Sequence, residues 1–161
     1  MAGSIEGRVL SLWKRWGKTA FGRRVYSLML GRMVPYSGSI GALVLQLEPG
    51  YVRIELRERR ALRNHLHSIH AIALANLGEL ASGLAMLAAL PGDVKAIVTK
   101  LEIEYLKKAR GRLLAEGRAE FPGAITGTVT HLALAEIRDN TGDVVARLHV
   151  YWQLKLNDPI R

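Results

Sequence analysis

Four residues around the start of one long apolar segment have the types and spacing for acid–base chemistry at a carbonyl group. Asn64 supplies an amide, His70 follows it by six residues, and Glu79 follows His70 by nine. A helix that begins beside His70 and Ala71 would add unpaired backbone N–H groups at the positive end of its dipole. Glu79 is a lone carboxylate among apolar residues, where an ionised group is costly unless it is paired or used. We therefore interpret Glu79 as an acid/base or nucleophilic carboxylate.

The element that must position Glu79 is a long helix that is apolar nearly all round and rich in alanine. Ser68 is a residue type that caps helix starts, and Pro91-Gly92 supplies a stop. At ~1.5 Å per residue the segment 69–90 would span ~33 Å, enough to cross a membrane. Polar residues interrupt it at His70, Asn76, Glu79 and Ser82. Because such a helix must be enclosed, the sequence predicts a buried core helix and not a membrane span.

Segments with a period of two surround this helix. Two strands are predicted before it, at residues 42–47 and 51–57, joined by a Glu-Pro-Gly turn. Four strands are predicted after it, at residues 97–105, 110–121, 125–138 and 144–156. The last two form a long hairpin closed by Asp-Asn-Thr-Gly. The predicted fold class is therefore α+β, with a curved antiparallel sheet wrapped around a long central helix.

The N-terminal residues 1–33 differ from the rest in charge and period. They contain seven basic side chains and one acidic one, so most of the net charge of +9 lies here. Val9, Leu12, Trp13 and Trp16 form an apolar stripe of helical spacing. The pattern predicts two short basic helices packed on the domain, followed by a loop over residues 33–41. The alternative is a peripheral membrane or nucleic-acid contact through residues 1–33.

Length and composition limit the classes of function. With 161 residues and 49% apolar residues, we expect one domain over residues 1–161, with a helical extension (1–33) and a core (41–156). The absence of cysteine excludes disulfides, thiolate metal sites and a cysteine nucleophile, and it suits the cytoplasm. No signal peptide is expected. The sequence contains no Gly-x-Ser-x-Gly elbow, Walker-type phosphate loop or Gly-x-Gly-x-x-Gly motif.

On these motifs the chain resembles the hotdog-fold acyl-CoA thioesterases, most closely the phenylacetate-pathway type and a related uncharacterised family. The resemblance covers the order of elements over residues 41–156. The spacing of Asn64, His70 and an acid nine residues later is similar to the pattern of those enzymes. His70-Ala71, followed by Asn-Leu-Gly-Glu at residues 76–79, is similar to the uncharacterised relatives.

The resemblance implies roles for four residues. Glu79 would be the general base or nucleophile, Asn64 would orient the substrate, and the helix-start amides at His70 and Ala71 would stabilise the oxyanion. The substrate would be an acyl-CoA or an acyl-carrier-protein thioester. Coenzyme A would enter only as part of that substrate, with no metal, no other cofactor and no nucleic acid.

Geometry adds a requirement for a second subunit. Nine helical residues separate His70 from Glu79 by ~13 Å along the axis, which is too far for both to act on one carbonyl group. We therefore expect a homodimer, or a dimer of dimers, in which the helix start of one subunit meets Glu79 of the other.

Several alternatives remain open at this stage. Many relatives have Gly-Gly after the histidine, whereas this chain has Ala71-Ile72, so a non-catalytic acyl-binding protein is the rival function. Glu79 could instead pair with a basic side chain from a partner, and His70 could be a buried, hydrogen-bonded imidazole. Histidines at positions 65, 67 and 70 would permit a zinc site, although no Asp or Cys nearby completes the ligand set. Basic residues before Asn64 could attract coenzyme A phosphates: Arg57, Arg59, Arg60 and Arg63.

Overall fold

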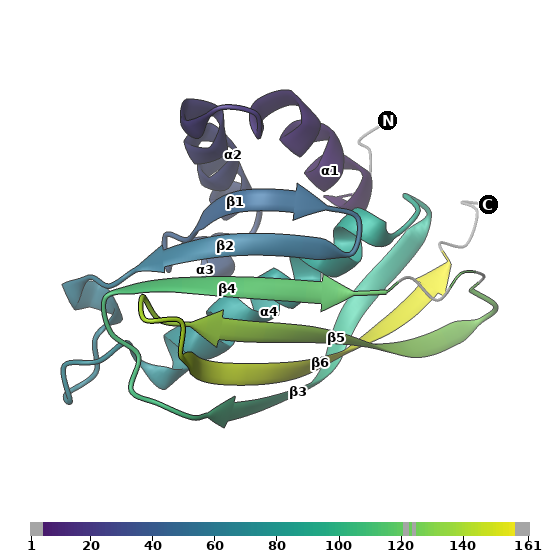
Figure 1. Ribbon diagram of the computed structural model, residues 1–161. Helices are drawn as coiled ribbons and strands as arrows, with labels where there is room; N and C mark the ends of the chain where they lie inside the picture. Colours follow the sequence, from purple (N-terminus) through teal and green to yellow (C-terminus); the bar gives the residue numbers. More distant parts are fainter. Residues whose placement is uncertain (1–4, 121–122, 124, 157–161) are drawn as a thin grey trace.

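A six-stranded antiparallel sheet forms the body of the molecule in the computed structural model, which describes residues 5–120, 123 and 125–156 (Figure 1). The strand order is β1-β2-β4-β5-β6-β3. The strands are β1 (Leu43–Glu48), β2 (Tyr51–Arg57), β3 (Val94–Tyr105), β4 (Arg112–Ala119), β5 (Thr128–Arg138) and β6 (Val144–Leu156). All six predicted strands are confirmed, with ends shifted by a few residues, and the α+β class with them. Parts of two predicted segments, residues 1–4 and Phe121, lie outside the described residues.

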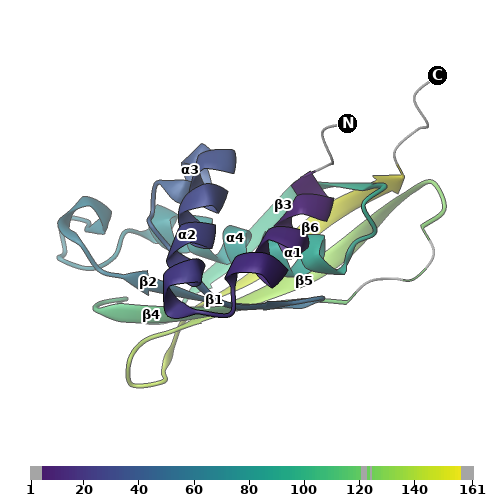
Figure 2. The same ribbon diagram turned by 90° about the horizontal axis from the view of Figure 1, so that it is seen from above.

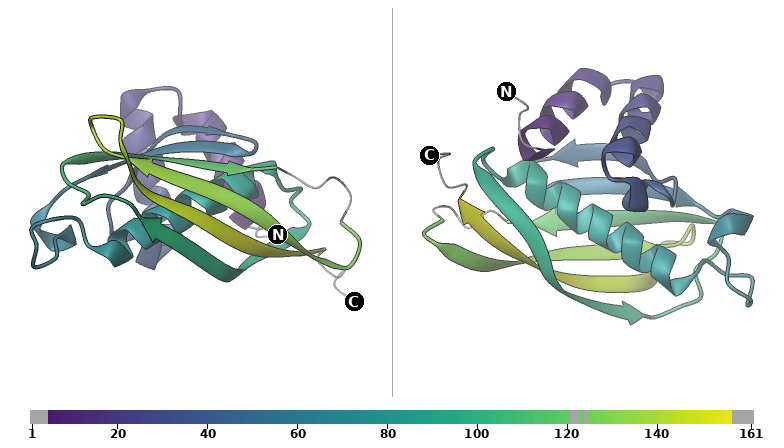
Figure 3. Two further views of the ribbon diagram at one scale, coloured as in Figure 1. Left: turned by 60° about the horizontal axis from the view of Figure 1, so that its bottom comes forward. Right: turned by 180° about the vertical axis from the view of Figure 1, so that it is seen from behind.

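The long helix α4 (Ala71–Ala89) crosses the concave face of the sheet (Figure 3). It packs so closely that a side chain on Gly117 of β4 would clash with the Ala81 carbonyl oxygen. A side chain on Gly78 would likewise clash with Leu148 of β6. Buried leucines and alanines of α4 therefore meet the inward residues of the strands. By length and composition α4 could cross a membrane, but two thirds of it is buried in the molecule, so it is the core helix that the sequence predicts.

Three further helices precede the sheet and lie on the same side of it as α4 (Figure 2). They are α1 (Ile5–Trp16), α2 (Ala20–Met33) and α3 (Pro35–Gly38). Trp13 meets Tyr26 edge-on with 5.1 Å between ring centres, and the Tyr26 hydroxyl donates to the Val9 carbonyl oxygen at 3.3 Å. These contacts hold α1 against α2. The two predicted N-terminal helices are confirmed.

The structure corrects three details of the sequence prediction. The N-cap of α4 is His70 and not Ser68, because the loop before it is held in an extended, hydrogen-bonded form. The predicted loop 33–41 contains the short helix α3, which Pro35 starts. Strand β3 contains a bulge at Thr99, which interrupts the period of two predicted for residues 97–105, so Ile97 lies on the outer face and is 62% exposed.

Candidate active site

The start of α4 offers one free backbone donor. His70 caps the helix, because its Nδ1 accepts a hydrogen bond from the Ile72 N–H at 3.1 Å. The His70 N–H itself donates to the Leu62 carbonyl oxygen at 2.7 Å, so it is not available to a ligand. Within the described residues the Ala71 N–H has no acceptor. Of the two predicted amide donors, Ala71 is therefore the one left open.

His70 is exposed, so its imidazole is not a core group. Its neutral Nδ1 is occupied in capping, which requires the proton to sit on Nε2. Histidines 65 and 67 are also exposed, and His67 adopts a positive φ of 52° in the turn before the helix. Across residues 5–120, 123 and 125–156, no three His, Cys, Asp or Glu side chains converge as a metal-binding group.

Asn64 organises the loop that leads into α4. Its Oδ1 accepts hydrogen bonds from the Leu66 N–H (2.9 Å), the Ser68 N–H (3.2 Å) and the Ser68 hydroxyl (3.1 Å). The Asn64 N–H donates to the Ser68 carbonyl oxygen at 2.9 Å. No described residue accepts from the Asn64 side-chain NH₂ group. Asn64 is thus tied to the helix start by its acceptor oxygen, and it keeps its amide donors free.

Glu79 lies two turns along α4 and is half-buried. Its carboxylate makes no ion pair or hydrogen bond to any part of the chain that the structure describes; Ser82 contacts only its backbone oxygen. Burial raises the pKa of the Glu79 carboxyl above its ordinary value. Within the described residues of one subunit Glu79 therefore has no basic partner, and a pairing with a basic side chain of a second molecule stays a prediction. An unpaired carboxylate with a raised pKa is a stronger base than an exposed one.

A tyrosine that sequence reasoning missed also contacts the helix start. Tyr105, at the end of β3, donates its hydroxyl proton to the Ala71 carbonyl oxygen at 3.0 Å, and burial raises its pKa. Its position on the inner face of β3 follows from alternation. The partner atom could not be predicted, because that contact depends on how α4 packs against β3.

The hydrogen bond between Tyr105 and Ala71 also indicates where Glu79 lies relative to strand β3. Moving away from the Ala71–Tyr105 contact, eight residues of helix cover about 12 Å and four residues of strand about 13 Å. Glu79 therefore lies about level with Leu101. Strand β3 is the last strand of the sheet, and no described element covers its outer edge. Glu79 and the free Ala71 N–H thus lie along the same open side of the molecule but far apart.

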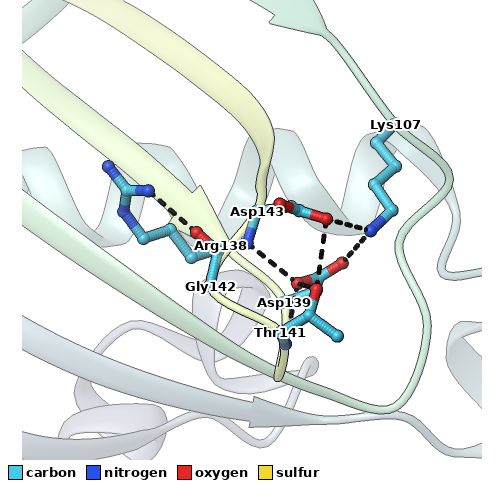
Figure 4. A network of polar contacts seen from close by, with 6 residues as sticks. All are labelled: Lys107, Arg138, Asp139, Thr141, Gly142 and Asp143. Atoms are coloured by element: carbon cyan, nitrogen blue, oxygen red, sulfur yellow. Dashed lines mark hydrogen bonds and ion pairs between the residues drawn. The ribbon is translucent and has the colours of Figure 1, made fainter.

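A polar network supports the segment between β3 and β4 (Figure 4). The Lys107 ammonium group donates to Asp139 and Asp143, each at 2.7 Å, and these bonds lower the pKa of both carboxyls. Two residues later, the Ala109 carbonyl oxygen accepts from the Ile69 N–H at 2.8 Å. The hairpin between β5 and β6 therefore helps to fix the residue that precedes His70.

The basic residues before Asn64 differ in their contacts. Arg57 pairs with Glu55, Arg63 pairs with Glu58, and Arg59 donates to the Ser39 carbonyl oxygen at 2.6 Å. Arg60 is exposed and has no partner among the described residues. Of these four side chains, Arg60 is the one whose charge is not already engaged.

Comparisons with known proteins identify one matching family and many solved structures with a similar fold. Residues 22–154 match the model of a family described as a domain of unknown function, DUF4442. A search of curated proteins found no match. One similar crystal structure is a structural-genomics target, APC5556, at 26% identity and a TM-score of 0.80, which covers 95% of this chain and 99% of its own.

Two other solved structures resemble the chain over most of its length. One is a Pseudomonas aeruginosa protein of unknown function described as a probable thioesterase, at 23% identity, with a TM-score of 0.70 over 81% of this chain and 93% of its own. The other is a thioesterase family protein from Silicibacter pomeroyi, at 17% identity, with a TM-score of 0.70 over 83% and 99%. These neighbours have the hotdog fold, in which a curved sheet wraps a central helix.

Proposed function

Because this chain belongs to the DUF4442 family and has the hotdog fold of thioesterases, we propose that it hydrolyses acyl thioesters, with an acyl-CoA as the substrate. The observation that carries this proposal is Glu79. A carboxylate held in an apolar helix, without a partner in the described part of the subunit, lowers the stability of the folded chain, and such a cost is typical of a group that serves the function. A cytoplasmic location suits both this substrate and the lack of cysteine.

The proposed site is shared by two subunits that meet through their β3 edges. An antiparallel pair centred on Glu102 would set Lys100 opposite the partner's Glu104, and Leu101 opposite the partner's Ile103. The two Glu102 side chains would face each other, and each is already paired with Lys100 of its own subunit at 2.6 Å. Glu79, level with Leu101, would then lie one or two strand residues from the partner's Tyr105 and the helix start beside it. The resulting homodimer would contain two equivalent sites. A tetramer formed by two such dimers would keep both sites of each dimer.

The chemistry requires only groups of the chain and a water molecule. Glu79 removes a proton from water, and the water oxygen attacks the thioester carbonyl carbon. The Ala71 N–H of the other subunit donates to the oxyanion that forms, while the Asn64 amide orients the substrate. Collapse of the intermediate breaks the C–S bond, and the thiolate of coenzyme A takes up the proton. His70 acts by holding the helix start, and no further cofactor takes part.

Direct attack by Glu79 on the carbonyl carbon would give an anhydride that water then hydrolyses, with the same net reaction. The two routes differ in where the solvent oxygen appears. In a single turnover in ¹⁸O-water, label in the Glu79 carboxyl would identify the anhydride route, because general-base catalysis places the solvent oxygen only in the released acid.

A non-catalytic acyl-binding role is the second candidate, and Ile72 favours it. Its side chain is 55% exposed directly beside the free Ala71 N–H, where Gly-Gly relatives leave more room for a thioester. An Ile72→Gly variant with much faster turnover, or tight acyl-CoA binding without hydrolysis by the natural chain, would favour this second role.

The direct test measures release of free thiol from a panel of acyl-CoA esters. Glu79→Gln should abolish turnover, while Glu120→Gln, which changes an exposed carboxylate with no contact in the described residues, should leave it unchanged. The folded state of each variant is checked by circular dichroism. Unchanged turnover in a folded Glu79→Gln protein would refute the proposed role.

A further inference from the structure

A hollow lies at the edge of the sheet opposite β3, between the N-terminal helices and β1. Its volume is about 880 Å³, within the range of ~300–1,000 Å³ typical of small-molecule sites. α2, α3 and the segment leading into β1 supply most of its lining, and Leu80 of α4 completes it. Successive helical residues point about 100° apart, so Leu80 and Glu79 face different sides of α4. The hollow is therefore separate from the proposed thioesterase site.

The walls of this cleft are apolar. Leu30 and Val44 form its buried part, and Leu43 and Leu80 are half-buried beside them. Leu28 of α2 stands at the lip, where it is 58% exposed. An apolar side chain left this open next to an apolar cavity marks a surface suited to a flexible hydrocarbon chain.

The charges at the cleft are unbalanced. Its one carboxylate, Glu55, already accepts hydrogen bonds from Arg57 at 2.6 Å and Arg112 at 2.5 Å. Although burial alone would raise the pKa of Glu55, these two bonds hold it below its ordinary value. Arg24 and Arg32 also line the cleft, and neither has an acidic partner within the described residues. Two uncompensated cations therefore remain at the lip.

The spacing of these cations indicates the kind of anion. Arg24, Leu28 and Arg32 are four residues apart on α2, so Leu28 lies between the two arginines, which are ~12 Å apart along the helix. A guanidinium group binds a carboxylate through two parallel N–H···O bonds of its planar fork, so either arginine could hold a single carboxylate head group. An apolar chain beside either arginine would enter over Leu28.

We propose that this cleft binds a long-chain fatty acid, with the carboxylate at the Arg24–Arg32 lip and the chain along the apolar walls. The proposal goes beyond thioester hydrolysis and does not depend on it. Hydrolysis of a fatty acyl thioester releases a fatty acid, so this site would bind the product of that class of reaction.

The test is isothermal titration calorimetry of the full chain with dodecanoate, below the concentration at which dodecanoate forms micelles. We expect saturable binding of one molecule per subunit. Dodecanol, which has the same chain without the charge, should bind at least tenfold more weakly. Raising the salt to 0.5 M should weaken dodecanoate binding several-fold, because the arginines are exposed.

Matched variants locate the binding. Arg24→Gln/Arg32→Gln should raise the dissociation constant at least tenfold. Lys14→Gln/Lys18→Gln removes the same charge from the N-terminal helices outside the cleft and should leave it unchanged. Ala42→Phe, which fills the lining, should abolish binding while thioester hydrolysis continues. Because both double variants change exposed side chains, their comparison stands even if Ala42→Phe does not fold.

Four results would overturn the proposal. They are the absence of saturable binding, equal weakening in the two double variants, dodecyl phosphate binding more than tenfold tighter than dodecanoate, and binding to anionic vesicles without binding to monomeric dodecanoate. The last two would assign the cationic lip to a phosphate ligand or to a membrane surface. A loss of fatty acid binding with intact hydrolysis, or the reverse, separates this proposal from the proposed function.

Discussion

The two edges of the sheet are treated in opposite ways. At the β1 edge, α2 lies across the strand, and the Ser27 hydroxyl accepts the hydrogen bond of the Val44 N–H at 2.9 Å. At the β3 edge, a strand of twelve residues pairs with β6 on one side and has no described element along its outer side. Exposed edge strands pair readily with other chains, and proteins normally cover or disrupt them. The N-terminal helices therefore close one edge of the sheet, and the proposed dimer would use the other.

The difference extends to the chemistry at each edge. The β3 side contains the unpaired carboxylate of Glu79 and the free N–H of Ala71, which one subunit alone keeps apart. The β1 side contains an apolar cleft with uncompensated cations that one subunit completes by itself. A shared reaction site and a self-contained binding site would therefore lie on opposite sides of the same central helix.

After the loss expected for Glu79→Gln, the next largest effect should come from removing the Ala71 N–H group on the β3 side. Ala71 is the first residue of α4, where proline is tolerated, and His70 has the extended conformation (φ −63°, ψ 140°) that proline requires before it. Ala71→Pro should leave the melting temperature almost unchanged and lower turnover ~10²–10³-fold, the usual cost of losing an oxyanion donor. Steady-state kinetics and thermal unfolding measure both. Full activity would remove Ala71 from the mechanism.

Charge reversal on the edge strand tests the dimer. Lys100→Glu would place like charges opposite each other in two symmetry-related pairs, at about 1 kcal/mol each, and so raise the dimer dissociation constant roughly tenfold or more. Adding Glu104→Lys should restore the dimer, while Lys95→Glu, farther along β3, serves as the control. Analytical ultracentrifugation follows the association, and turnover should fall with it at low protein concentration. Failure of the double variant to recover would exclude the proposed register.

At the covered edge the expected effect is smaller. Ser27→Ala leaves the Val44 N–H without its acceptor and should lower the free energy of unfolding by about 1 kcal/mol. Ser11→Ala, which removes only an exposed hydrogen bond to the Arg8 carbonyl oxygen, should have little effect. Urea unfolding measures the difference. Turnover should be unaffected, since Ser27 lies on the side of the molecule away from β3.

The pH dependence of stability should show the cost of the Glu79 charge. Because burial raises the pKa of Glu79 in the folded state, the folded protein is favoured while the group is protonated and loses stability as pH rises through the folded pKa. Glu79→Gln should therefore be more stable than the natural chain at pH 8, and the difference should vanish below pH ~4. Thiol release should rise with pH over the same range, since a base must be deprotonated. If the Glu79→Gln variant and the natural chain were equally stable at pH 8, burial of the Glu79 carboxylate would carry no measurable cost.

Local sequence signals were sufficient for most of the fold. In β2 and in the β5–β6 hairpin, the period of two indicates which face of each strand is buried, even when the neighbouring strand is unknown. The unbroken apolar character of α4 likewise indicates that this helix is enclosed. The bulge at Thr99 was missed, because only pairing with β6 shows that one residue is extra. The cap was assigned to Ser68 instead of His70, because both residue types can accept a hydrogen bond and the backbone of the preceding loop decides between them.

Reading along the chain is enough to place a carboxylate at position 79 after an amide at 64 and a histidine at 70, with a helical spacing too long for both to act on one carbonyl group. Which of their atoms remain available follows only from the packed fold. It engages the His70 N–H with Leu62, leaves the Ala71 N–H open, and adds the Tyr105 hydroxyl. The physical reason is that spacing along a helix is fixed by its geometry, whereas hydrogen-bond partners across a fold depend on packing between residues distant in sequence.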